Sequence, residues 1–158
     1  MILFVAIGGL LALMGYIVLF ASQDNVHLEL VEVSLHEIEV LEIDSVDNKA
    51  ELQVAFLVKN PGEKTFTVPL ISYELFANGK SLGTGQYSTE DVAMPGRAAF
   101  YGGAEIPLKN KFNMVMTDVN AQEYQAIING EQVSFSAKGM ITAETAWSLI
   151  EKDFETSM

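Results

Sequence analysis

The chain begins with a long uncharged segment, after which apolar and polar residues alternate. Residues 1–21 contain no charged side chain, and the first charge is Asp24. As a helix rising 1.5 Å per residue, this segment would be about 31 Å long, which matches the hydrocarbon core of a bilayer. The pattern predicts a transmembrane helix over residues 1–22 and a folded domain over residues 26–156.

A cleaved signal peptide and a buried core helix are the alternatives for the first segment. A signal peptide normally has a basic start, an apolar run of about 7–15 residues and a small-x-small cleavage site. Here no Lys or Arg precedes the apolar run. Ala21 is small, but Leu19 two places before it is not, so the cleavage pattern is not met. A buried core helix is seldom uniformly apolar beyond about 14 residues. We therefore interpret the segment as a retained anchor, in which Gly8 and Gly15 lie near one face and could pack against another helix.

Beyond the anchor, alternation with a period of two residues predicts a succession of short strands. The alternation is strictest over residues 50–58, and Asn60-Pro61-Gly62 then predicts a turn. Asn78-Gly79 is typical of a two-residue hairpin turn, because both residues accept a positive φ. The expected strands cover residues 26–40 (with a one-residue slip near Leu30–Val31), 50–58, 66–68, 71–75, a return strand from Ser81, 98–106 loosened by Gly102-Gly103, 133–142, and 147–154.

One helix is expected within the domain. Asn120 is a suitable N-cap, apolar residues follow at helical spacing, and Gly130 is a suitable end. A backward extension over residues 112–119 is the alternative, and it would place Asn120 inside the helix. Residues 94–97, Met-Pro-Gly-Arg, predict a type II turn.

Seven or eight short strands and one helix predict an all-β fold, an antiparallel immunoglobulin-like β-sandwich. Aromatic residues at alternating positions are expected in its core: Phe56, Phe66, Tyr73, Phe100, Phe135 and Trp147. If the two sheets splay at one end, the same side chains would line an apolar groove for a lipid or another apolar ligand.

The composition excludes nucleic acid as a partner and cysteine as a reactive group. Nine Lys and Arg stand against 21 Asp and Glu, for a net charge of −12, so no basic surface is available for nucleic acid. The absence of cysteine excludes disulfides and thiolate chemistry. Eight acidic residues and no basic residue lie between Asp24 and Lys49. By the positive-inside rule, the domain is expected on the extracytoplasmic side of the cell membrane.

No set of residues stands out as a catalytic, cofactor or metal site. His27 and His36 are flanked by acids, so a histidine–carboxylate metal site is conceivable, but two solvated histidines on an acidic strand are the simpler interpretation. Gly79, Gly83 and Gly85 fall in a hairpin rather than between a strand and a helix, so they do not form a phosphate-binding loop. We expect a protein that is not an enzyme and has no cofactor.

One stretch of the domain resembles a known family. Residues 52–85, LQVAFLVKNPGEKTFTVPLISYELFANGKSLGTG, resemble the late-embryogenesis-abundant type 2 domain, also called the WHy domain. The family pattern joins an LxVxxxVxNP strand to a Pro-Ile/Leu strand and then to YxLxxNGxxLGxG. The matching residues with structural roles are Asn60, Pro61, Pro69, Tyr73, Asn78, Gly79, Gly83 and Gly85. The chain departs from the family at Gly62-Glu63-Lys64 and at Gly102-Gly103.

The resemblance implies a fibronectin-III-like sandwich of about seven strands with one helix and no catalytic residues. Family members with a single N-terminal anchor are similar to this chain in layout, and they are associated with stress tolerance. The expected function is therefore a membrane-tethered, non-catalytic binding or protective module. The alternatives are an accessory subunit of a larger membrane complex, whose partner helix would pack on Gly8 and Gly15, and a carrier of lipid or another apolar ligand.

Overall fold

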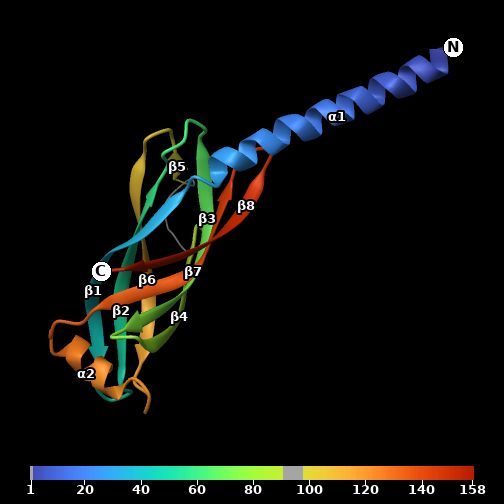
Figure 1. Ribbon diagram of the computed structural model, residues 1–158. Coiled ribbons are helices and arrows are strands. Elements are labelled where there is room, and N and C mark those ends of the chain that lie inside the picture. The colour runs from blue at the N-terminus through green and yellow to red at the C-terminus, as the bar shows by residue number, and fades with distance from the viewer. Residues whose placement is uncertain (1, 91–97) are drawn as a thin grey trace.

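The computed structural model describes the backbone of residues 2–90 and 98–158, and the side chains of residues 4–19, 26–90 and 98–158. The type II turn predicted over residues 94–97 lies outside the described residues. In chain order the elements are α1 (Ile2–Leu28), β1 (Glu32–Asp44), β2 (Lys49–Lys59), β3 (Phe66–Ala77), β4 (Lys80–Ser88), β5 (Ala99–Phe100), β6 (Glu105–Val115), α2 (Ala121–Ile128), β7 (Phe135–Glu144) and β8 (Leu149–Ser157). Figure 1 shows that α1 extends away from the domain formed by the other elements.

The domain is an antiparallel sandwich of two sheets, as predicted. One sheet has the order β1-β2-β6, and the other has the order β4-β3-β7-β8 with β5 paired to β3. The sheets approach each other along both edges, where β4 contacts β6 and β1 contacts β8. The Leu35 N–H donates to Thr156 Oγ1 (3.0 Å) at one edge, and Asn110 Nδ2 donates to the Gln86 carbonyl (3.3 Å) at the other. These bonds pair backbone groups that edge strands would otherwise leave exposed.

Aromatic side chains fill the space between the sheets. Phe56 of β2 contacts Tyr73 of β3 edge-on, with ring centroids 4.8 Å apart, and Phe154 of β8 in the same manner at 5.6 Å. Phe66 and Phe100 stack at 5.3 Å near the end of the domain that meets α1. The strict alternation of β2 produces this core, because every second side chain points inward.

The boundary between helix and domain differs from the prediction. Residues 26–28, expected to begin the first strand, continue α1 to Leu28, which is fully buried in the core. The register slip expected near Leu30–Val31 lies elsewhere in β1, between Leu35 and Glu37 and again between Val40 and Glu42. Apolar residues at 26, 28, 30 and 31 fit both a strand with a slip and a helix followed by a turn, and burial of Leu28 against the sandwich selects the helix.

Residues 66–77 form one strand rather than two. Pro69 does not interrupt β3. The register of β3 with β4 begins after it, at Leu70, and the register with β7 shifts between Thr67 and Leu70. A ladder position without an N–H donor is tolerated at such an irregularity.

By contrast, residues 98–106 form two strands instead of one. β5 pairs with β3 in one sheet, and β6 pairs with β2 in the other. Gly102-Gly103 lies at this crossing, where Gly103 has φ +79° and a Cβ on Gly102 would lie 2.9 Å from the Gly62 carbonyl oxygen. The crossing therefore requires glycine at both positions.

The short helix lies where it was predicted, but its start is built differently. α2 begins after Asn120 and is followed by Gly130 at φ +71°. Asn120 makes no side-chain cap bond to α2. Its side chain instead accepts the Thr117 N–H (2.7 Å) and donates to the Val115 carbonyl (3.1 Å), so it shapes the turn that leaves β6. The backward extension of the helix is wrong, because residues up to Val115 belong to β6.

Candidate functional site

The junction between α1 and the sandwich is a specific packed structure. Leu28 and Val31 are both buried. Lys152 of β8 donates from Nζ to the carbonyl oxygens of Glu29 (2.8 Å) and Val31 (2.7 Å), in the turn that follows α1. A cation is favourable here, because the carbonyl end of a helix carries a partial negative charge. The last strand of the domain therefore holds the first helix.

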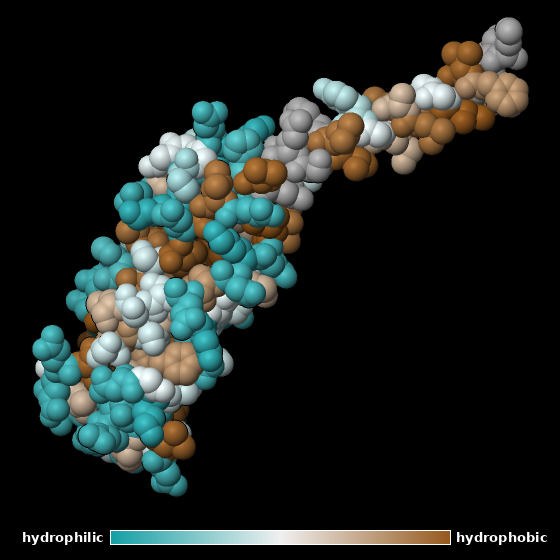
Figure 2. Space-filling view, in the orientation of Figure 1, coloured by the Kyte–Doolittle hydropathy of each residue, from teal (hydrophilic) through white to brown (hydrophobic). Residues whose placement is uncertain are grey.

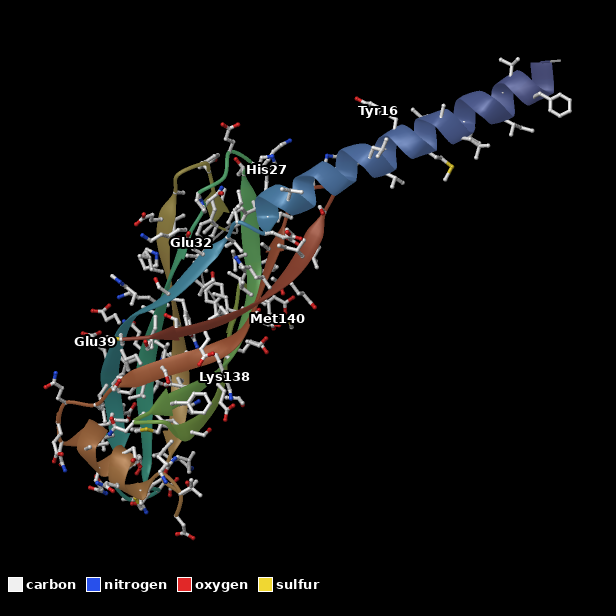
Figure 3. The ribbon with its side chains drawn as sticks, in the orientation of Figure 1. Tyr16, His27, Glu32, Glu39, Lys138 and Met140 are labelled. Atoms are coloured by element: carbon white, nitrogen blue, oxygen red, sulfur yellow. The ribbon has the colours of Figure 1, made fainter. Side chains whose placement is uncertain are left out.

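Asn60, from the motif of residues 52–85, stabilises the loops next to this junction. Its Nδ2 donates to the carbonyl oxygens of Lys64 and Phe100, both at 2.8 Å, and its Oδ1 accepts the Gly62 N–H at 3.0 Å. Its backbone also pairs with the loop of residues 101–104. A Cβ on Gly62 would lie 3.5 Å from the carbonyl of His27, at the domain end of α1 (Figure 3). Asn60 thus connects the loop of residues 61–64 to the segment of residues 100–104, next to the domain end of α1.

Tyr73 and Gly85, also from the motif, meet inside the sandwich. A Cβ on Gly85 would lie 2.5 Å from Cζ of Tyr73 and 2.8 Å from the ring of Phe112. The Tyr73 hydroxyl accepts a hydrogen bond from Asn110 Nδ2 (2.7 Å). Burial raises the pKa of Tyr73 to about 12, against the opposing effect of the Asn110 bond. These contacts lock β3 against β4 and β6.

The other motif residues form turns and irregularities. Asn78 (φ 49°) and Gly79 (φ 79°) make the hairpin turn, and Gly83 (φ 125°) lies at the register shift of β3 and β4. Pro61 is exposed, and Pro69 lies at the irregularity of β3 described above. Each motif residue is accounted for by backbone geometry or packing, and the motif does not gather around one cavity.

The glycines proposed for helix packing lie in the open. Apart from the chain neighbours and the nearby backbone of α1 itself, no atom of the described residues would come within 4 Å of a Cβ on Gly8 or Gly15. The large apolar side chains described on α1 between residues 4 and 19 are exposed, and Figure 2 shows hydrophobic side chains along the coloured part of the helix. Among the residues described with their side chains, no helix is long and apolar enough to cross a membrane.

Exposed apolar side chains reappear at the end of the domain beside α1. They are Leu30, Tyr101, Trp147 and Leu149. Trp147, predicted to lie in the core, is 75% exposed instead. It occupies the turn between β7 and β8, where Thr145 Oγ1 accepts the N–H groups of Trp147 (3.3 Å) and Ser148 (3.1 Å). This turn stops the alternation before it reaches Trp147.

An open groove of about 910 Å³ runs across the sheet of β4, β3, β7 and β8. Its lining has two rows of outward side chains, Gln86, Ser72, Met140 and Asp153 in one and Thr84, Glu74, Lys138 and Glu155 in the other. Lys138 and Met140 lie on β7 (Figure 3). Lys138 is 3.9 Å from Glu74 and 4.7 Å from the centroid of Phe76. The groove is shallow and lies on the outward face of one sheet, unlike the apolar groove between splayed sheets considered from the sequence.

The two histidines do not form a common site. His27 ends α1, whereas His36 is exposed in β1 at a register shift. The part of the chain that the structure describes brings no three His, Cys, Asp or Glu side chains together in a group that could hold a metal ion.

Sequence reasoning missed Lys152 and Asn110. Each is polar in a strand that otherwise reads as ordinary alternation, and each finds its partner through the tertiary fold. A signal was present for both, because Asn110 takes an inward position of β6 between Leu108 and Phe112, and Lys152 takes one of β8 between Ile150 and Phe154.

Comparison with known proteins shows that a solved structure shares the fold of this chain. No family model matches the chain, and no curated protein matches it in sequence. The solution structure of AT1g01470 from Arabidopsis thaliana is similar, with 13% identity, 80% of each chain covered and a TM-score of 0.52. A crystal structure of a protein from Archaeoglobus fulgidus (17% identity, 79% of this chain and 94% of that one, TM-score 0.44) and a solution structure of a putative late embryogenesis abundant protein (10%, 96% and 84%, TM-score 0.46) were also found.

Proposed function

We propose that the chain is a non-catalytic β-sandwich module held at the cell membrane by α1, with the sandwich on the extracytoplasmic side. We further propose that it serves in stress tolerance, as its resemblance to the late-embryogenesis-abundant type 2 family implies. One observation carries the membrane part of the proposal, namely that α1 exposes apolar side chains on all its sides.

The exposure of α1 is extreme for a folded protein. Phe4 is 78% exposed and Leu11 63%, and the neighbouring apolar side chains are similar. Successive residues of a helix point about 100° apart, so an unbroken apolar run covers the whole circumference. A helix that is apolar all round requires an apolar environment, which a bilayer or a bundle of other helices supplies. The uncharged run of residues 1–21 has the length that a bilayer requires.

An accessory subunit of a membrane complex is the second candidate. It is favoured by Gly8 and Gly15, because glycine has no side chain and so allows the backbone of another helix to approach α1 closely at this face. A carrier that holds its ligand between the sheets is disfavoured, because Phe56, Tyr73 and Phe154 fill the centre of the sandwich.

Membrane attachment is tested by expressing the full chain and extracting the membrane fraction with alkaline carbonate. The wild type should stay in the membrane. Leu11→Lys combined with Met14→Lys should release it, because each lysine at the centre of a membrane helix costs about 2.5–3.5 kcal/mol. The matched control adds the same charge to the far end of the domain, as Val46→Lys with Val119→Lys, and should stay in the membrane. Release of the wild type by carbonate would overturn the proposal.

The side of the membrane can be read with a single cysteine, because the natural chain has none. Ser157→Cys places one thiol at the exposed end of β8. A membrane-impermeant maleimide should label it on intact cells. Labelling only after the cells are lysed would place the sandwich in the cytoplasm and refute the proposed orientation.

The protective role is tested on vesicles that contain a trapped dye and are dried and rehydrated. Vesicles that carry the full chain should leak less than vesicles that carry the same amount of an unrelated single-span protein. Equal leakage would refute protection of the membrane and leave the attachment test unaffected.

Native mass spectrometry of the chain extracted from its own membrane in mild detergent separates the two candidates. A monomer supports the free-standing module, whereas an assembly of fixed stoichiometry with other proteins supports the accessory subunit.

A further inference from the structure

The end of the domain beside α1 carries a small apolar surface. We call its four exposed residues, Leu30, Tyr101, Trp147 and Leu149, the anchor-end surface. They come from three loops or strand ends: the turn after α1, the loop between β5 and β6, and the turn between β7 and β8. In Figure 2 hydrophobic side chains again gather where the domain meets α1, whereas hydrophilic and intermediate side chains cover most of the visible face beyond.

Packing limits how far this surface extends along α1. Lys152 of β8 bonds the turn that follows α1, and α1 itself contacts β8. Leu149 precedes Lys152 by three residues, which is up to about 10 Å of strand at 3.3 Å per residue. About six to seven residues of helix cover the same distance at 1.5 Å per residue, so Leu149 lies no farther along α1 than about the level of residues 22–24. The uncharged run of α1 ends at this level, at Asp24.

The side chains of this surface suit the boundary between lipid and water. Trp147 is 75% exposed and Tyr101 66%. Indole and phenol rings join an apolar body to a polar group, and they are enriched at membrane interfaces for that reason. At the far end of the domain the exposed apolar side chains, such as Val46 and Val119, are aliphatic. Within the described part of the domain, beyond α1, both aromatic rings among the exposed large apolar side chains lie at the anchor end.

We propose that the anchor-end surface docks on the bilayer surface, with Trp147, Leu149 and Tyr101 among the lipid headgroups. This inference rests on the proposed anchoring of α1, which would bring the same end of the domain to the membrane. A second copy of the chain fits the surface less well, because a net charge of −12 makes two copies repel each other. Exposed Glu29 and Glu151 are close in sequence to Leu30 and Leu149, and exposed Glu63 lies against Gly102, next to Tyr101, so the preferred bilayer is neutral rather than anionic.

The natural chain contains its own probe, because Trp147 is its only tryptophan. The full chain is reconstituted into phosphatidylcholine vesicles, and Trp147 emission is compared with that of the same chain in vesicles whose acyl chains carry bromine near the headgroup. Bromine quenches an indole only at close range. Neutral acrylamide, which the protein charge does not repel, measures access from water.

Docking predicts that brominated lipid strongly quenches Trp147 and that acrylamide reaches it several-fold less than it reaches a free indole. Adding anionic lipid at low salt should weaken both effects. A second reporter, Tyr101→Trp with Trp147→Phe, should behave like Trp147. The matched control, Val119→Trp with Trp147→Phe, should show no quenching by bromine and full access to acrylamide.

Three results would overturn the inference. The first is a Trp147 signal equal to that of the Val119→Trp control in vesicles that retain the chain after carbonate washing, which would leave the anchoring proposal intact. The second is loss of the chain from the vesicles, which would remove both proposals. The third is an emission shift that grows with protein concentration at fixed lipid without quenching by bromine, which would assign the surface to a second copy of the chain.

Discussion

The side chain of Asn60 provides a sharp test of how the junction is held. Asn60 is 1% exposed and makes three side-chain hydrogen bonds, two as donor to carbonyl oxygens and one as acceptor. Truncation to alanine removes all three and leaves buried backbone groups without partners. A hydrogen bond contributes about 0.5–1.5 kcal/mol net, and an orphaned buried group costs about 1–3 kcal/mol. Asn60→Ala should therefore lower the free energy of unfolding by about 3–5 kcal/mol.

Urea unfolding of the full chain in mild detergent, followed by circular dichroism, measures this loss. At a slope of about 2 kcal/mol per molar urea, the midpoint should fall by about 2 M. Asn113→Ala, at an exposed position of β6, is the matched control and should change the free energy by less than about 0.5 kcal/mol. A midpoint shift of Asn60→Ala no larger than that of the control would refute the role assigned to the three bonds.

A second substitution at the same position adds a pH signature. Asn60→Asp keeps the size of the side chain but turns both donors toward the carbonyls of Lys64 and Phe100 into acceptors. Burial and the facing carbonyls disfavour the ionised carboxylate, so the folded-state pKa of this Asp lies above its unfolded value of about 3.9. The variant should be most stable relative to wild type below that pH and lose stability as the pH rises toward 7. A difference from wild type that does not change with pH would contradict this account.

Three further predictions concern the core and the junction. Gly85→Ala should lower the free energy of unfolding by about 1–3 kcal/mol, because its Cβ would overlap the ring of Tyr73, whereas Gly8→Ala should leave it unchanged; urea midpoints decide. Tyr73 should stay protonated until about pH 12 in an absorbance titration of the folded chain, and deprotonation at pH 10 would contradict this prediction. Because its pKa is raised from 10.0 on folding, the stability that Tyr73 contributes is present below pH 10 and is lost as the pH passes 12. Lys152→Met should speed amide exchange in the turn after α1 while exchange in β2 stays the same, and equal protection in both variants would show that the lysine does not hold the helix.

The sequence predicted those features that local chemistry decides. Strict alternation located β2, and Asn78-Gly79 located the hairpin, because period and turn geometry depend on neighbours in the chain. The end of α1 could not be predicted in this way, since residues 26–31 satisfy two local patterns and the burial of Leu28 chooses between them. The crossing at Gly102-Gly103 was read as a loosened strand, because only the partners of β5 and β6 show that they belong to different sheets.

The candidate site divides in the same manner. Asn60 and Gly85 were identified from a motif at fixed spacing, although their contacts were not. Trp147 was assigned to the core because it continues an alternating pattern, and the bonds of Thr145 that end the pattern depend on side-chain geometry. Lys152 takes an inward position of β8 between Ile150 and Phe154, but its partner could not be identified from the sequence, since it lies 121 residues away along the chain.

The separation between Lys152 and its partner has a consequence for how the protein is made. α1 leaves the ribosome before β8, because Lys152 follows its partner Val31 by 121 residues. At about 5–20 residues per second, that interval is roughly 6–24 s. During this time α1 is already available for insertion into a membrane, whereas the strand that binds it has not been made. Nothing from β8 therefore holds α1 against the domain yet. The angle between α1 and the domain is fixed only once β8 has joined its sheet and Lys152 has bonded the turn after α1.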